Sequence, residues 1–174
     1  MNQDLRYLVC IAARITTICV MIMANTAQQI AALPIRWTKS GKFQVLMVTS
    51  RDTGRWIMPK GWTMNGKKPW AAAEIEALEE AGALGYISHE VIGRYTYKKK
   101  LGAGSSVTCS VDVYPMMVER LKSNWKERAE RKRKWFSAKG AAKRVSEPAL
   151  AELLKSLEKK PAKQPVIREF LKAS

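Results

Sequence analysis

The stretch GWTMNGKKPWAAAEIEALEEAGA, residues 61–83, decides the fold of this 174-residue chain. Its second half predicts a helix over 69–81. Pro69 suits the first helical position, the run is rich in Ala, Glu and Leu, and Gly82 fits the stop at the carboxyl end. A loop containing two glycines leads into this helix, so a loop–helix unit forms the centre of the chain.

The predicted helix carries three carboxylates on one side. Glu76, Glu79 and Glu80 follow i,i+3 and i,i+4 spacing and fall within a sector of about 100°. Like charges placed this way destabilise a bare helix, and a hard divalent cation such as Mg²⁺ removes the repulsion. A solvated acidic helix face is the alternative interpretation, because many surface helices contain such a run.

The charge balance makes this acidic window unusual. The chain has 31 Lys and Arg against 15 Asp and Glu, a formal net charge of +16. Residues 61–93 are the exception, with two Lys and five Glu. The basic excess favours an anionic partner, which is nucleic acid, a phosphate-rich small molecule or an acidic membrane surface. The acidic window inside it is a candidate cation site.

Outside residues 61–83, hydrophobic alternation and turn residues predict an α/β chain. Gly- and Pro-rich segments separate the elements, and no internal repeat is visible. The predicted strands are 28–37, 43–50, 89–100, 106–119 and 131–137, and the further predicted helices are 138–144 and 147–159.

Residues 61–83 resemble the Nudix box, G-x5-E-x7-R-E-U-x-E-E-x-G-U, in which U is an aliphatic residue. The matching positions are Gly61, Glu76, Ala77, Glu79, Glu80, Gly82 and Ala83. The resemblance implies hydrolysis of diphosphate linkages with Mg²⁺ or Mn²⁺. It also implies that Glu76, Glu79 and Glu80 are catalytic metal ligands, with the Gly61 carbonyl helping to hold the metal. The general base is one of these glutamates or a carboxylate elsewhere in the chain.

Two positions depart from the Nudix box. Lys67 stands where the pattern has its first glutamate, and Ile75 stands where it has arginine. In the family that arginine orients a catalytic glutamate through a charge-assisted hydrogen bond, which an isoleucine cannot make. The departures lead to a second hypothesis, a Nudix-fold module that binds polyphosphates with impaired catalysis.

The resemblance extends over roughly residues 27–157. The segments around the box are similar to the diphosphoinositol polyphosphate phosphohydrolase branch, which also takes diadenosine polyphosphates. The upstream segment is RDTGRWIMPKGW (51–62), and the downstream segment runs over 124–154 and contains the Trp135–Phe136 pair. The implied fold is an α/β/α sandwich with a mixed β-sheet between helices. The branch also places a further acidic residue near the metals, for which Glu127 is the better candidate and Glu130 the second.

Basic residues flank the box on both sides and suit phosphate binding. A solvated surface is the alternative for many of them. The predicted substrate-binding residues are Arg51, Arg55, Lys60, Arg131 and Arg133.

The preferred function is therefore a pyrophosphohydrolase acting on an anionic, phosphate-rich small molecule. A nucleic-acid-binding protein is a third hypothesis, since most of the basic excess lies in residues 94–174. Three scattered cysteines (Cys10, Cys19 and Cys109) favour a reducing, cytoplasmic compartment.

The expected domain organisation has three parts. Residues 1–23 form an extension, 24–159 form the Nudix domain, and 160–174 form a basic tail. Arg6 and Arg14 interrupt the apolar run of the extension, so an over-long start or an amphipathic helix is favoured over a membrane anchor. A stable association with membranes is not expected.

Overall fold

A computed structural model of the chain describes residues 26–102, 104–159 and 161–172. The chain divides into two compact units. One comprises Lys98–Cys109 and the chain up to Ala27, and the other comprises Gln28–Tyr97 and Ser110–Ser174. Every residue of the site described below belongs to the second unit.

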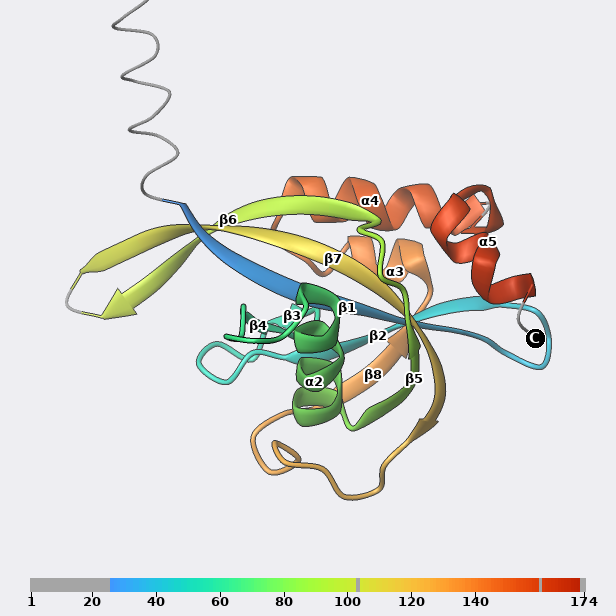
Figure 1. The fold of residues 1–174 in the computed structure, drawn as a ribbon, viewed down its shortest axis with the longest axis horizontal. Helices are drawn as coiled ribbons and strands as arrows, with labels where there is room; N and C mark the ends of the chain where they lie inside the picture. Colours follow the sequence, from blue (N-terminus) through green and yellow to red (C-terminus); the bar gives the residue numbers. More distant parts are fainter. Residues whose placement is uncertain (1–25, 103, 160, 173–174) are drawn as a thin grey trace, which may run out of the picture. The chain divides into compact units, whose positions relative to one another are not determined.

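The strands of the described residues form an eight-stranded sheet with the order β3-β2-β1-β7-β5 (Figure 1). β4 pairs with β1, β6 with β7, and β8 with β2. The β1 and β7 arrows run in the same direction, whereas β2 is antiparallel to β1, so the sheet is mixed. The strands are β1 (Thr26–Trp37), β2 (Phe43–Thr49), β3 (Trp56–Ile57), β4 (Lys60–Trp62), β5 (Ala83–Ile87), β6 (Gly93–Gly102), β7 (Ser105–Leu121) and β8 (Arg133–Phe136).

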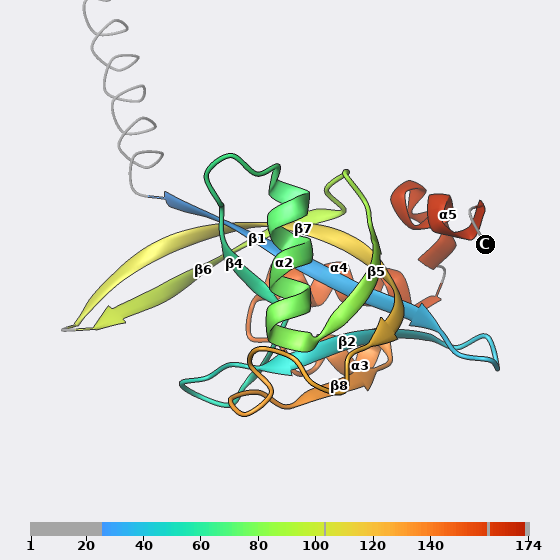
Figure 2. The same ribbon diagram turned by 60° about the horizontal axis from the view of Figure 1, so that its bottom comes forward.

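Helices cover both faces of the sheet in the second unit (Figure 2). The helix α2 (Pro69–Ala81) lies on one face, and α3 (Ala138–Ala142) and α4 (Pro148–Lys159) lie on the other. The alternation of side chains along β2 feeds two separate cores. Val45 and Met47 pack with α3 and α4, whereas Leu46 and Val48 pack with α2. This layering confirms the predicted α/β class.

The helix α2 has the predicted bounds. Proline occupies its first position, and Gly82 ends it in the left-handed conformation with φ 61°. The residues of α2 that face the sheet are small, which lets the helix lie close to it. They are Ala72, Ala73, Ala77 and Ala81.

Several elements differ from the sequence-based expectation. β5 was not predicted, because Gly85 interrupts its short apolar run at the point where the pairing with β7 is irregular. β6 begins at Gly93 rather than at 89. In the segment 161–172, a short 3₁₀ turn (Pro161–Lys163) precedes α5 (Pro165–Lys172), and Ile167 is fully buried in the core beside α4. The predicted extension 1–23 lies outside the described residues.

Candidate active site

The backbone of β4 and the side chain of Glu76, a predicted metal ligand, approach each other closely. A Cβ atom added to Gly61 would lie 2.0 Å from Oε1 of Glu76, so only glycine leaves room for that carboxylate. The amide of the neighbouring Lys60 donates a hydrogen bond to Oε2 of Glu80 at 3.2 Å. Glu76 and Glu80 of α2 therefore lie against the same short stretch of the β4 backbone.

Glu80 lies in the buried part of this cluster. Its side chain pairs with the guanidinium of Arg131, whose own side chain is only 5% exposed. The same guanidinium pairs through Nε with Glu127, four residues earlier in the chain. Its Nη1 donates to the backbone carbonyl of Thr49 at 2.8 Å. One arginine thus joins α2, the segment before β8 and the end of β2.

The electrostatics of the cluster favour added positive charge. Burial raises the pKa of Glu80 from 4.5 to about 7, against the opposing effect of Arg131, and Glu76 and Glu127 raise it further. Burial also raises the pKa of Glu76, and the neighbouring charges of Glu79 and Glu127 add to the shift. Because Arg131 does not neutralise the whole cluster, a further cation would stabilise the ionised carboxylates.

The segment 122–132, here called the docking loop, is fixed to the end of α2. Its hydrogen-bond donors and those of Arg133 satisfy four consecutive carbonyls that the helix itself leaves unpaired. The amide of Glu127 donates to the Glu79 carbonyl at 3.1 Å, and the indole of Trp125 donates to that of Glu80 at 3.2 Å. Arg133 Nη1 donates to the Ala81 carbonyl at 2.5 Å, and the Lys122 amide donates to the Gly82 carbonyl at 2.8 Å.

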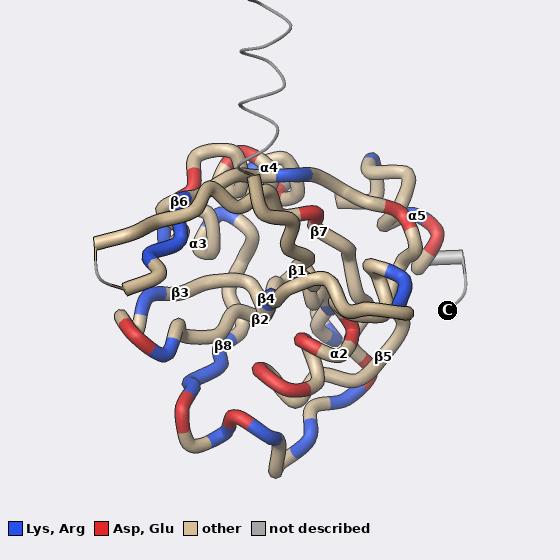
Figure 3. Tube along the Cα trace, turned by 60° about the vertical axis from the view of Figure 1, so that its left-hand side comes forward, with Lys and Arg blue, Asp and Glu red and all other residues tan. Residues whose placement is uncertain are grey.

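A cation-rich pocket of about 430 Å³ opens beside this loop. Figure 3 shows basic and acidic residues alternating along the segment that leads into β8. Arg51 reaches across from the turn after β2, with Nη1 3.5 Å from a carboxylate oxygen of Glu130 and 3.9 Å from one of Glu127. Glu127 and Glu130 raise the pKa of Arg51. The pocket is lined by Thr49, Ser50, Arg51, Gly54, Arg128, Ala129, Glu130, Arg131 and Lys132.

The other predicted substrate-binding residues lie in different surroundings. Lys60 donates through Nζ to the Tyr97 hydroxyl at 3.1 Å. Arg55 forms an ion pair with Glu147 at 3.1 Å, near the start of α4. Arg133 stacks on the Trp125 ring, 3.9 Å from its centroid, at the end of α2. The structure therefore gathers Arg51 and Arg131 beside the carboxylates, while Arg55 and Arg133 contact other partners.

The donor set fits a hard divalent cation. Carboxylate and carbonyl oxygens are the ligands that Mg²⁺ prefers, and the missing Cβ of Gly61 leaves the space that the Glu76 carboxylate enters. Within the described ranges, no three His, Cys, Asp or Glu side chains already stand in a ligating arrangement. Glu80 and Glu127 are engaged by Arg131, and Glu79 pairs with Lys126 at 2.8 Å.

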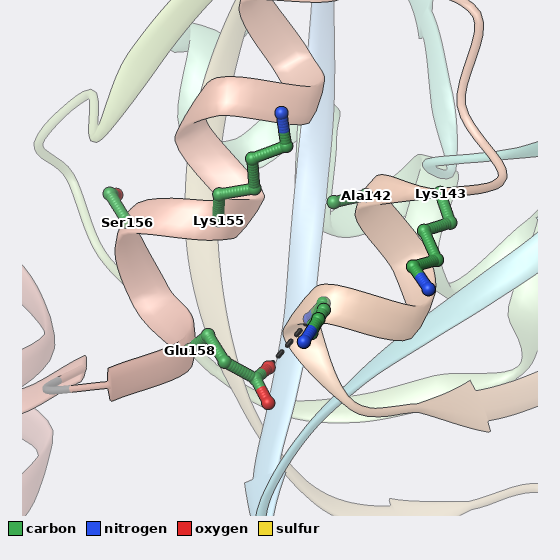
Figure 4. A pocket seen from close by; sticks show the side chains of 6 residues that line it. Ala142, Lys143, Lys155, Ser156 and Glu158 are labelled. Atoms are coloured by element: carbon green, nitrogen blue, oxygen red, sulfur yellow. Dashed lines mark hydrogen bonds between the residues drawn. The ribbon is translucent and has the colours of Figure 1, made fainter.

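A second pocket, of about 420 Å³, lies between α3 and α4 on the other face of the sheet (Figure 4). The amide of Lys139 in α3 donates to the carboxylate of Glu158 in α4 at 2.6 Å, which links the two helices at the pocket. The lining consists mainly of lysine stems and small residues, and it contains none of the predicted site residues. The lining residues are Lys139, Ala142, Lys143, Lys155, Ser156 and Glu158.

Sequence reasoning missed two contributors to the cluster. Thr49 acts through its carbonyl oxygen, which every residue carries, so no side-chain signal marks it. Trp125 holds the Glu80 carbonyl from 45 positions away, and only the folded path of the docking loop brings the two together.

Curated relatives match about two thirds of the chain. Nudix hydrolase 16, mitochondrial, of Arabidopsis thaliana is 31% identical over 121 residues, which cover 67% of each chain. Human diphosphoinositol polyphosphate phosphohydrolase 3-alpha is also 31% identical, over 66% of this chain and 69% of its own. Nudix hydrolases 13 and 12 of the same plant are matched over 52% and 61% of their lengths. No family model matches the chain.

Solved structures share the fold. An Ap4A hydrolase of C. elegans, solved as a binary complex, superposes with a TM-score of 0.58 at 20% identity, over 78% of this chain and 98% of that one. A MutT protein of Methanosarcina mazei superposes with a TM-score of 0.55 at 14% identity, over 78% and 95%. Among the helices of the described ranges, none is both long and apolar enough to cross a membrane.

Proposed function

Because the chain belongs to the Nudix hydrolase family, we propose that it is a Mg²⁺- or Mn²⁺-dependent pyrophosphohydrolase. The substrate is a phosphate-rich small molecule, such as a diadenosine polyphosphate or a diphosphoinositol polyphosphate. Relatives that carry the corresponding names support this substrate class. The observation that carries the proposal is the carboxylate cluster around the buried Glu80, beside a cation-rich pocket.

The carboxylates of the cluster would bind the metal and accept a proton from the attacking water. Glu76, Glu79, Glu80 and the Gly61 carbonyl would hold the divalent cation, with Glu127 close by. When bound, the cation supplies Lewis-acid polarisation of a phosphoryl oxygen and lowers the pKa of a coordinated water. The chain's own carboxylates are the groups available to accept the proton of the attacking water.

The pocket would hold the phosphates that are not being cleaved. Arg51 is 56% exposed, and Arg128 and Lys132 line the same opening. Arginine presents paired donors that match phosphate oxygens, and lysine adds a mobile positive charge. A substrate with several phosphates would therefore reach both this opening and the carboxylates, which orients its P–O–P bridge.

The direct test is product release from a panel of substrates with millimolar Mg²⁺. The panel contains a diadenosine polyphosphate, an inositol pyrophosphate, a nucleoside triphosphate and a nucleotide sugar. We expect metal-dependent turnover of the phosphate-rich members, lost in Glu80→Gln. The matched control is Glu152→Gln, which changes an exposed glutamate of α4 and keeps wild-type turnover.

Ile75 and Lys67 support a second candidate, a polyphosphate-binding module without turnover. No turnover of any panel member, with polyphosphate binding intact, would exclude the hydrolase and leave this candidate. Tight RNA or DNA binding without Mg²⁺, together with no turnover, would instead support the nucleic-acid hypothesis.

A further inference from the structure

The helix that carries the catalytic glutamates lacks its own cation. Residue 75 lies one helical turn before Glu79, where an arginine would reach the carboxylates of the same face. The isoleucine at this position has no hydrogen-bond donor. The positive charge near these glutamates therefore comes from elsewhere in the chain.

The docking loop supplies that charge at two points. Lys126 pairs with Glu79, but its side chain is 65% exposed, so the pair is weak. Arg131 is 5% exposed and pairs with both Glu80 and Glu127. Of the two cations, Arg131 is the one held in a fixed geometry.

Three different acceptors fix the guanidinium of Arg131. Nη2 donates to Glu80, Nε donates to Glu127, and Nη1 donates to the Thr49 carbonyl. The carboxylates keep free lone pairs, since each oxygen accepts two bonds. Arg131 can therefore orient both carboxylates while they bind a metal ion or a water molecule.

The backbone keeps Arg131 in register with the helix. The Glu127 amide donates to the Glu79 carbonyl, and the Arg131 amide donates to the Glu127 carbonyl at 3.0 Å. The Lys132 amide donates to the Thr49 hydroxyl at 2.9 Å, which attaches the far end of the loop to β2. Because the loop backbone is fixed on both sides of Arg131, the Arg131 side chain is suited to positioning the carboxylates rather than to following a mobile substrate.

We infer that Arg131 positions the carboxylates of Glu80 and Glu127, in the place of the arginine that the Nudix pattern has at position 75. The inference rests on the proposed function. It makes Arg131 a positioning residue and distinguishes it from the exposed cations of the pocket, which would contact the substrate.

The test uses the full chain with Arg131→Met, Arg131→Lys and the double variant Arg131→Met/Ile75→Arg. Mn²⁺ binding is followed by the electron paramagnetic resonance signal of the free ion, and kcat and KM are measured on the best panel substrate. Thermal unfolding verifies that each variant folds. Arg94→Met is the matched control, because Arg94 also pairs with a carboxylate, that of Asp112, away from the cluster.

We expect Arg131→Met to weaken Mn²⁺ binding and to lower kcat by about 10–100-fold, with KM changed less than about twofold. Arg131→Lys retains part of both properties, and adding Ile75→Arg to Arg131→Met restores part of them. Arg94→Met behaves as the wild type. If Arg131→Met does not fold, the Arg131→Lys and Arg131→Lys/Ile75→Arg pair gives the same comparison.

Two results would overturn the inference without touching the proposed function. One is a raised KM in Arg131→Met with kcat and Mn²⁺ binding unchanged, which would make Arg131 a substrate contact. The other is no recovery when Ile75→Arg is added. If the wild type shows no metal-dependent turnover of any panel member, the proposed function itself fails, and the inference fails with it.

Discussion

Gly61 sets how closely the Glu76 carboxylate approaches the backbone of β4. A methyl group added at Gly61 would lie 2.0 Å from Oε1, far below any van der Waals contact, so a side chain there must displace the carboxylate. Because Glu76 is only half-buried, we expect the cost to fall on the proposed metal site rather than on the core.

Gly61→Ala tests this residue. We expect Mn²⁺ affinity to fall by about tenfold or more, because one ligand is moved from its place. The measurement is an Mn²⁺ titration of the metal-free protein. The control is Gly140→Ala in α3, where the nearest atom to the new methyl group is the Ser137 hydroxyl at 3.1 Å. Equal affinity in both variants would show that Glu76 does not hold the metal.

At the scale of elements, α2 and the docking loop form one unit. Four donors from residues 122–133 satisfy four consecutive carbonyls at the end of the helix. Each such bond contributes about 0.5–1.5 kcal/mol, and leaving a buried carbonyl unpaired costs a similar amount or more.

Trp125 offers the cleanest test of this unit. Trp125→Phe removes the N–H that holds the Glu80 carbonyl and keeps a ring under Arg133, so we expect a loss of about 0.5–1.5 kcal/mol in the free energy of unfolding. Trp125→Ala also removes the ring contact and should cost more. Urea denaturation measures both variants. Equal losses of unfolding free energy in the two variants would show that only the hydrogen bond contributes. No loss in Trp125→Phe would show that the hydrogen bond does not contribute.

Elements defined by local sequence signals were predicted, whereas those that depend on contacts between distant residues were not. The helix 69–81 was predicted with its correct bounds because a proline start and a glycine stop are local signals. β5 was missed because pairing with β7, rather than its own residues, makes it a strand. The contact between Arg131 and Glu80 spans 51 positions and depends on the folded loop, so the sequence placed Arg131 near the site without indicating its partners.

At the scale of the whole molecule, the net charge of +16 acts on every anionic ligand. The Debye length shrinks from about 10 Å at 0.1 M salt to about 3 Å at 1 M. We therefore expect KM for a polyphosphate substrate to rise steeply with KCl concentration, while kcat changes little. Steady-state kinetics at several salt concentrations measure this, with a nucleotide sugar as the less charged comparison. A KM independent of salt would exclude long-range steering.

The helix α5 adds an apolar side chain to the core of the molecule. The segment 160–174 was predicted as a basic tail, and Ile167 of α5 is fully buried in the core cluster that also contains Leu157 of α4. We expect Ile167→Ala to cost about 2–4 kcal/mol of unfolding free energy, measured by urea denaturation. Val166→Ala, at a half-buried neighbour, should cost much less. Equal small losses would show that α5 contributes little to the fold.

The attachment of the docking loop to α2 has a consequence for changing what the protein accepts. The loop forms one wall of the cation-rich pocket and also anchors Glu80 and Glu127, so under the proposed function substrate recognition and catalysis depend on the same segment. The opposite wall is the Ser50–Arg55 turn, which closes on itself through the Ser50 amide and the Arg55 carbonyl at 2.8 Å. We therefore expect a library of substitutions restricted to positions 51–54 to change the ligand preference and to preserve metal binding. Substitutions at 126–131 are expected to impair both ligand recognition and metal binding.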